Sequence, residues 1–224
     1  MRTINVIKGD IQFQWKYGFY LLYFIMVVLY LLFLSLLNGT VKETVAAICV
    51  YSDPAAMGMF FMGAMVLLEK SQKILSSLAV SPMKPGEYIA GKVVSIALIS
   101  ELVGLVIMHQ GKTQNYILTI IGILAGSLLF SFCGIIVGTK INTINQYIVG
   151  TLPFEMIGFV PVIAYRIGFL WNSKWMLIHP GCAAIRLIEG DGSMLLFCIC
   201  SVVVWIMLLY VIAIRCVRKM FAER

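Results

Sequence analysis

The chain has 224 residues, of which 61% are hydrophobic and 12% charged, and it carries a formal net charge of +7. Long apolar runs and a mean hydropathy of +0.98 exclude an ordinary soluble domain and indicate a polytopic membrane protein. No water-exposed segment is long enough for a nucleic-acid-binding domain, so the positive charge is interpreted as a topology signal.

Residues 1–16 precede the first apolar run and predict a short helix lying in the membrane interface. Ile4, Ile7, Ile11 and Trp15 are spaced along one helical stripe. Val6 and Phe13 interrupt the polar side, so an ordinary polar lead-in to the first span is the alternative.

The apolar runs predict six transmembrane helices, and only helices satisfy their own backbone hydrogen bonds in lipid. Each run is close to the ~20 residues that cross a bilayer. Pro54 is expected to interrupt the second run. The runs are roughly residues 17–37, 45–68, 93–109, 116–139, 147–168 and 194–214. The expected fold is therefore all-α, with one transmembrane domain over residues 1–224.

Lysine and arginine set the expected orientation. If the N-terminus is cytoplasmic, 12 of the 17 basic residues lie in cytoplasmic segments. Both termini and residues 69–92 are then on the cytoplasmic side of the membrane. Residues 171–193 are outside, and their mixed polarity fits either short helices dipping into the outer leaflet or a plain folded loop.

The stretch GEYIAGKV, residues 86–93, lacks the hydroxyl residue that a phosphate-binding loop places after its lysine. We therefore interpret Lys92 as an interfacial anchor at the inner end of a span. Just before it, residues 69–80 predict a short cytoplasmic helix. Ile74, Leu75 and Leu78 form its apolar side, and Glu69 and Lys73 contribute polar contacts.

Residues 116–139 carry the glycine pairs Gly122/Gly126 and Gly134/Gly138, whose spacing permits close helix contact in lipid.

Three acidic residues fall in or near the predicted spans. Asp53, Glu101 and Glu155 are costly in lipid, so they are expected to face the interior of the bundle. They either hold helices together or line a cavity for cationic or amphipathic cargo. No catalytic motif and no metal-ligand spacing of cysteine and histidine is present in the sequence, so we expect no enzymatic site, metal or cofactor on this chain.

Residues 52–95 resemble the type-2 ABC transporter permeases, in particular small drug- or fluoroquinolone-export-like permease subunits of bacteria. The matching positions are Glu69, Ser81–Pro82, Glu87–Tyr88 and Lys92. The resemblance implies that the segment after the second span is a coupling helix that docks on a separate ATPase subunit. The expected docking residues are Glu69, Lys73, Ile74, Leu75, Leu78, Pro82 and Glu87.

The resemblance also implies that ATP and Mg²⁺ bind the partner subunit, and that a second copy of this chain, or a related permease, completes the pathway. Cargo that is drug-like, peptidic or amphipathic would move outward. Two other functions are compatible with the residues. One is a proton-coupled secondary transporter that uses Glu101 and Glu155, and the other is a membrane scaffold that transports nothing.

Overall fold

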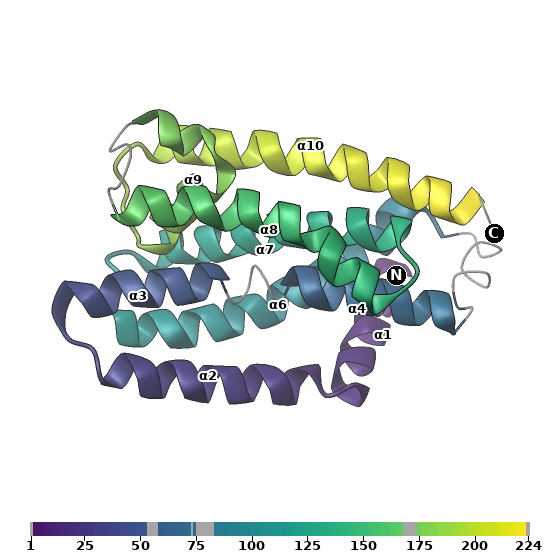
Figure 1. The fold of residues 1–224 in the computed structure, drawn as a ribbon, viewed down its shortest axis with the longest axis horizontal. Helices are drawn as coiled ribbons and strands as arrows, with labels where there is room; N and C mark the ends of the chain where they lie inside the picture. The colour runs from purple at the N-terminus through teal and green to yellow at the C-terminus, as the bar shows by residue number, and fades with distance from the viewer. Residues whose placement is uncertain (1, 53–57, 73, 75–82, 168–173, 223–224) are drawn as a thin grey trace.

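The structure is a computed structural model that describes residues 2–52, 58–72, 74, 83–167 and 174–222, which form helices and turns without any strand. Figure 1 shows the helices packed side by side along one long axis, with both termini toward the same end. In chain order the helices are α1 (Arg2–Lys16), α2 (Phe19–Ser35), α3 (Gly39–Ser52), α4 (Gly58–Ser71), α6 (Pro85–Gly111), α7 (Tyr116–Lys140), α8 (Ile144–Ile167), the 3₁₀ helix η2 (Lys174–Ile178), α9 (Pro180–Ile188) and α10 (Leu195–Ala222).

Four of the described helices, α6, α7, α8 and α10, are each long and apolar enough to span a membrane. Helices α1 and α2 meet at an angle of 67° and pass the same test as a pair, which gives up to five spans. The all-helical membrane class is thus confirmed, whereas the count of six spans stays a prediction.

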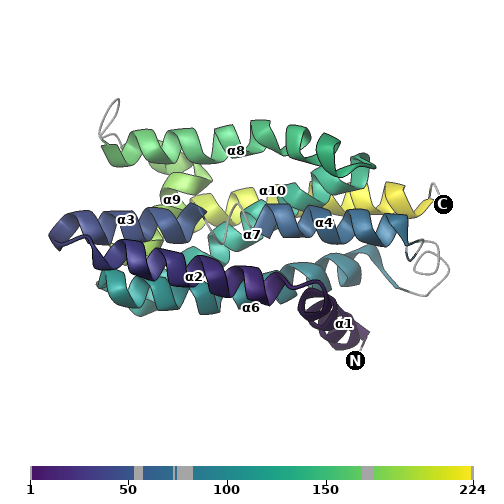
Figure 2. The ribbon, with the colours of Figure 1, turned by 60° about the horizontal axis from the view of Figure 1, so that its bottom comes forward.

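The predicted second span is divided between two short helices. Helices α3 and α4 have 14 residues each, too few to cross a ~30 Å hydrocarbon core alone at ~1.5 Å per residue. Both contact α6, and Figure 2 shows them following one another along the long axis. The expected break at Pro54 lies outside the described residues.

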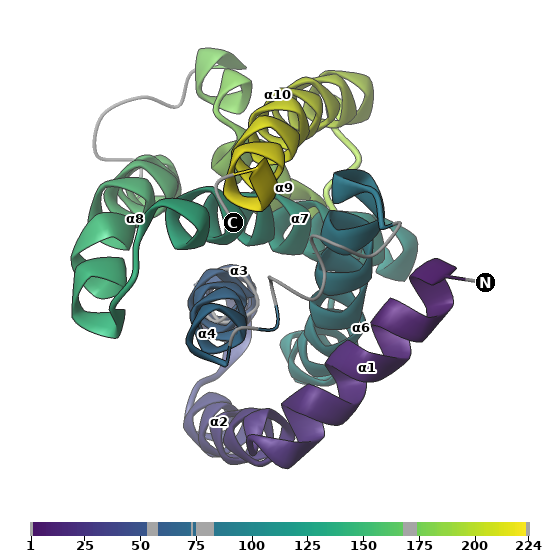
Figure 3. The same ribbon diagram turned by 90° about the vertical axis from the view of Figure 1, so that its right-hand side faces the viewer.

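Helix α7 is the centre of the bundle, because it contacts α4, α6, α9 and α10. Helices α8 and α10 are mostly exposed, and Figure 3 shows them at the periphery, on either side of α7. Helix α8 is attached through Tyr147, which packs on Gly63 of α4 and donates a hydrogen bond to the Met59 carbonyl oxygen at 2.6 Å. The peripheral helices therefore present large apolar surfaces away from the core.

At two of the glycines on α7 that were predicted to permit close helix contact, the backbone of a neighbouring helix lies close by. A Cβ atom added at Gly134 would lie 2.7 Å from the Met59 carbonyl oxygen of α4, and one added at Gly122 would meet the backbone of α9 at Ile188. By contrast, a Cβ at Gly126 would have no neighbour within 4 Å. The small residues thus matter at specific positions and not along the whole stripe.

Helix α1 crosses the bundle and packs against α6 and α2. The two ends of its apolar stripe are exposed, Ile4 by 55% and Trp15 by 75%, whereas Ile7 and Ile11 between them are partly buried. Its other side turns Asp10 and Gln14 into the protein. The sharp turn into α2 requires a φ of +75° at Gly18, and glycine adopts this left-handed conformation at little cost. An interfacial position for α1 stays a prediction, because no membrane bounds the structure.

The described residues of the predicted outer segment contain two short helices, η2 and α9, and their insertion into the outer leaflet stays a prediction. Helix α9 is almost entirely buried and contacts α3, α7, α8 and α10. Ser201 and Trp205 of α10 donate hydrogen bonds to the Ile178 carbonyl oxygen at 2.9 and 3.1 Å. The segment is therefore an integral part of the bundle, at the end opposite the two termini (Figure 1).

The glycine contacts generate a matched pair of substitutions. Gly134→Ala should destabilise the protein by about 1–3 kcal/mol, because its methyl group overpacks the α4–α7 contact. Gly126→Ala should be neutral or stabilising by up to ~1 kcal/mol, because alanine favours the helix and the space is open. Thermal unfolding of the detergent-solubilised protein measures both, and equal effects would contradict the assignment of Gly134 as a helix-contact position.

Candidate functional site

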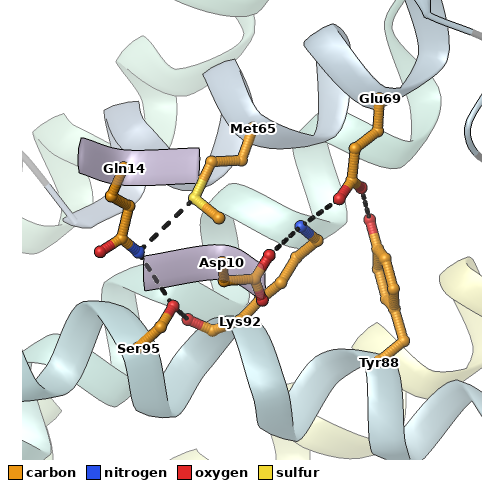
Figure 4. Close-up of polar contacts among 7 residues, drawn as sticks. All are labelled: Asp10, Gln14, Met65, Glu69, Tyr88, Lys92 and Ser95. Carbon is orange, nitrogen blue, oxygen red and sulfur yellow. Dashed lines mark hydrogen bonds and ion pairs between the residues drawn. The ribbon is translucent and has the colours of Figure 1, made fainter. Parts of the chain in front are cut away.

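The most unusual feature of the interior is a cluster of charged side chains from three helices. Lys92 of α6 is 1% exposed. Its Nζ lies 2.6 Å from Glu69 Oε1 on α4 and 3.2 Å from Asp10 Oδ1 on α1. Figure 4 shows the ammonium group between the two carboxylates. The cluster therefore ties together helices that are far apart in the sequence.

Hydrogen bonds extend this ion cluster on both sides. The Tyr88 hydroxyl donates to Glu69 Oε2 at 2.7 Å. Gln14 Nε2 donates to Ser95 Oγ at 2.9 Å, and Ser95 Oγ donates to the Lys92 carbonyl oxygen at 2.8 Å. Each carboxylate and amide thus has a defined orientation (Figure 4).

Helical spacing explains why these residue types converge. Tyr88, Lys92 and Ser95 occupy positions i, i+4 and i+7 of α6, and Asp10 and Gln14 are four residues apart on α1. Such spacing places side chains on one face of a helix. The same face of α6 carries Gly91, where an added Cβ would collide with Val6 of α1. Glycine therefore lets α1 approach closely enough for Asp10 to reach Lys92.

The electrostatics make the cluster a structural clamp. It holds two carboxylates and one ammonium group, and Asp10 Oδ2 and Gln14 Oε1 have no hydrogen-bond partner among the described residues. Taking charges out of water is expensive, and their attraction compensates only while all partners are present. Separating α1, α4 and α6 at this point would leave a buried charge unpaired, so these three helices are expected to move together.

The interpretation of Lys92 as an interfacial anchor is wrong. A side chain reaching for water would be exposed, whereas this one is enclosed by carboxylates that compensate its burial. Residues 86–93 lie in the first turns of α6. Their backbone N–H groups beyond the first turn are therefore engaged in the helix, and the carboxylates beside Lys92 would repel a phosphate. The geometry agrees with the rejection of a nucleotide site.

The predicted docking residues divide into three groups. The Glu69 carboxylate is held inside the protein by Lys92 and Tyr88. Glu87 Oε2 accepts a hydrogen bond from the Lys84 backbone N–H at 2.9 Å and caps α6, and Ile74 is partly buried. The remaining predicted residues, Lys73, Leu75, Leu78 and Pro82, lie outside the described residues. A docking role for the segment stays a prediction.

The predicted pathway residues are not brought together within one chain. Both carboxyl oxygens of Glu101 on α6 are buried without a hydrogen-bond partner in the described part of the chain, and Glu155 on α8 is partly buried. Figure 3 places α6 and α8 on opposite sides of α4. Asp53 lies outside the described residues, so its role also stays a prediction.

An apolar hollow of about 230 Å³ lies between α3, α7, α8, α9 and α10. The Tyr51 hydroxyl and the Trp205 indole N–H donate to backbone carbonyl oxygens, so their rings contribute an apolar lining. The aromatic residues that line the hollow are Tyr51, Phe130, Phe154 and Trp205, together with His179. This hollow could not be predicted from local patterns, because its walls come from five separated segments.

At the end of the bundle that carries α9, Arg166 of α8 and Glu189 after α9 form an ion pair with 2.6 Å between Nη2 and Oε1. Burial raises the pKa of Glu189 to about 7, and the neighbouring Arg166 opposes this rise only in part. The carboxyl group of Glu189 therefore gains its charge as the pH rises through about 7. The ion pair joins α8 to α9 far from the ion cluster at the other end.

The ion cluster predicts a large loss of stability when Lys92 is replaced by an uncharged residue. Lys92→Met should destabilise the protein by about 3–5 kcal/mol, because it leaves two buried carboxylates without their cation. Lys8→Met on the exposed side of α1 is the control and should change stability by less than ~0.5 kcal/mol. Unfolding of the detergent-solubilised protein measures both.

A triple variant separates the charge effect from simple loss of packing. Asp10→Asn/Glu69→Gln/Lys92→Met removes all three charges and should recover most of the stability that Lys92→Met loses. A triple variant less stable than Lys92→Met would show that the three charges do not act as one unit.

Comparison with known proteins agrees with the resemblance noted in the sequence. Residues 1–224 match the Fluoroquinolones export permease protein family. Two relatives named Fluoroquinolones export permease protein, from two strains of Mycobacterium tuberculosis, are each 24% identical over 131 residues, which is 57% of this chain and 54% of the relative. The match thus spans about half the length of these relatives. Because the family match covers the whole chain, this protein belongs to the fluoroquinolones export permease protein family.

Proposed function

We propose that this chain is the membrane-spanning permease subunit of a bacterial ABC exporter, driven by ATP hydrolysis on a separate ATPase subunit. Family membership supports a transport role. The observation that carries the proposal is the position of the ion cluster. Glu69 lies before the segment that would receive the ATPase and Lys92 lies after it, and their buried charges form an ion pair.

The cluster offers a route for motion from that segment into the bundle. Force applied between residues 70 and 87 acts on the ends of α4 and α6, and Lys92 ties both ends to Asp10 of α1. Separating them would expose unpaired buried charges, so the three helices respond as a unit. In this proposal ATP and Mg²⁺ bind the partner, and a second copy or a related permease supplies the other half of the pathway.

The apolar hollow supports an aromatic, drug-like cargo. Its volume of about 230 Å³ and its aromatic walls suit a flat apolar ring system. The name of the relatives, which refers to fluoroquinolone export, points in the same direction for those proteins. We infer that cargo contacts this hollow during outward transport.

A proton-coupled secondary transporter is the second candidate. The buried Glu101 carboxyl without a hydrogen-bond partner among the described residues favours it, because such groups in membrane helices often carry protons. Transport by the purified chain that is abolished by an uncoupler, with no ATPase subunit present, would support this candidate over the exporter.

Two glutamates, one in the cluster and one outside the segment, test the ATP-driven proposal. Glu69→Gln removes one cluster charge while retaining a side chain that can bond to Tyr88 and Lys92, so transport per ATP hydrolysed should fall severalfold. Glu43→Gln removes an exposed charge on α3, away from the predicted docking residues, and should leave this ratio unchanged. Copurification with the ATPase subunit, followed by paired assays of hydrolysis and transport in vesicles, measures the ratio. Equal ratios for the two variants would contradict coupling through the cluster.

A role of the apolar hollow in cargo transport is tested by placing a larger side chain at an exposed position, so that packing of the core is retained. Ile157 lines the hollow and is 64% exposed, whereas Ile163, also on α8, is 42% exposed and does not line it. Ile157→Trp should fill part of the hollow and lower export of an aromatic dye severalfold, whereas Ile163→Trp should not. If both variants export the dye as the parent does, the hollow is not on the cargo path.

A further inference from the structure

The apolar hollow is closed where its helices pack closely on one another. Helix α7 forms its floor with Leu129, Phe130 and Cys133. A Cβ atom added at Gly158 of α8 would lie 2.7 Å from the Phe130 ring, so α8 rests directly on α7 beside the floor. At one end α9 meets α8, because a Cβ atom added at Gly181 would lie 3.1 Å from the Gly158 carbonyl oxygen. The floor and this end therefore leave no passage.

The mouth of the hollow lies between α8 and α10, which hardly contact one another in the described part of the chain. Helix α8 packs on α4, α7 and α9, whereas α10 packs on α6, α7, α9 and η2. Both helices supply walls of the hollow, and Figure 3 shows them standing apart on either side of α7. The most exposed lining residues belong to these walls, with Ile157 of α8 64% exposed and Trp205 of α10 38% exposed. The hollow therefore opens sideways between the two peripheral helices.

The surface around this mouth is apolar. Met156 and Val160 of α8 and Val204 and Leu208 of α10 are all exposed. Both helices are long and apolar enough to span a membrane, so their exposed apolar side chains are expected to face hydrocarbon. The mouth thus leads into the bilayer and not into water.

The inside of the hollow suits an uncharged aromatic molecule. None of the lining residues that the structure describes carries a fixed charge. The Tyr51 hydroxyl and the Trp205 indole N–H are engaged by the carbonyl oxygens of Gly158 and Ile178. Burial lowers the pKa of His179, so its imidazole is uncharged at neutral pH. An ion would lose its hydration here without compensation, whereas a flat ring packs well on aromatic walls.

We propose that the apolar hollow takes uncharged aromatic molecules directly from the hydrocarbon core of the bilayer, through the mouth between α8 and α10. Cargo would be selected first by its partition into lipid and then by the shape of the aromatic walls. The inference rests on the proposed cargo role of the hollow, and it adds the route of entry and the charge class of the cargo.

The test labels the full chain in liposomes with an uncharged aryl diazirine that partitions into the bilayer. Light expels dinitrogen from the diazirine, and the resulting carbene inserts into a C–H bond of the side chain that it contacts. Peptide mass spectrometry should locate adducts at Leu129 or Cys133 on the floor, besides those on exposed side chains of α8 and α10. Ile135, a fully buried residue of the same central helix, should stay unlabelled.

This labelling needs neither ATP nor an ATPase subunit. A labelled floor combined with transport that does not depend on ATP would leave the lipid route standing and contradict the ATP-driven exporter alone. Failure of one proposal is thus distinguishable from failure of the other.

Two neighbouring residues of α8 provide matched variants. Ile157 lines the mouth and is 64% exposed, whereas Met156 is 63% exposed and does not line the hollow. Ile157→Trp should obstruct the mouth and lower labelling of the α7 floor severalfold. Met156→Trp should leave labelling of the floor as it is in the parent. Thermal unfolding verifies that both variants retain the stability of the parent.

Four outcomes would overturn the proposal. An unlabelled floor beside labelled side chains on α8 and α10 would show that the mouth is closed to lipid, as a second copy of the chain seated on it would cause. Labelling of the floor by a charged, water-soluble diazirine would place the entrance in water. Equal labelling by a diazirine on a straight alkyl chain would contradict the selection of aromatic molecules. An equal loss of labelling in both tryptophan variants would show that Ile157 does not mark the entrance.

Discussion

The enclosure of Lys92 by two carboxylates is the constraint on which the arrangement of α1, α4 and α6 depends. A lone ammonium group could not remain in this environment, and neither could either carboxylate. One charged side chain on each of α1, α4 and α6 therefore fixes the rotation of that helix about its axis and its position along the axis. Apolar packing alone would allow neighbouring helices to slide, since many apolar contacts are nearly equivalent in energy. The ion cluster selects one register among them.

Close packing around α7 plays the corresponding role in the centre. Gly134 and Gly122 bring the backbones of α4 and α9 against α7, so the middle of the bundle is held by short-range contact and not by charge. Helices α8 and α10 also pack on this group, but most of their surface remains exposed. The molecule thus combines a fixed inner group of helices with two peripheral ones, and the aromatic hollow lies where these groups meet.

The sequence was sufficient to predict the membrane class, the family and the general positions of the helices, because long apolar runs and the motif over residues 52–95 are local signals. It failed at Lys92, because a lysine at the start of a span looks the same whether it meets water or a carboxylate from another helix. The apolar residues Val6 and Phe13 on the inward side of α1 were a usable signal. They contact the protein, through Gly91 and through Tyr17 and Phe19 respectively. Asp10 and Gln14, four residues apart beside them, could have been identified as inward-facing on that basis, but their partners could not.

The turn at Gly18 constrains how the chain can change in length. Helix α1 is fixed at Asp10 by the ion cluster and at Gly18 by the left-handed turn that starts α2. Inserting or deleting one residue between these points would rotate Asp10 by about 100° around the helix and remove it from Lys92. The turn between α2 and α3 contains no comparable pair of fixed points among the described residues. Natural variation in length should therefore be rare within residues 10–18 and more common near Asn38, a pattern that sequences from many organisms would record.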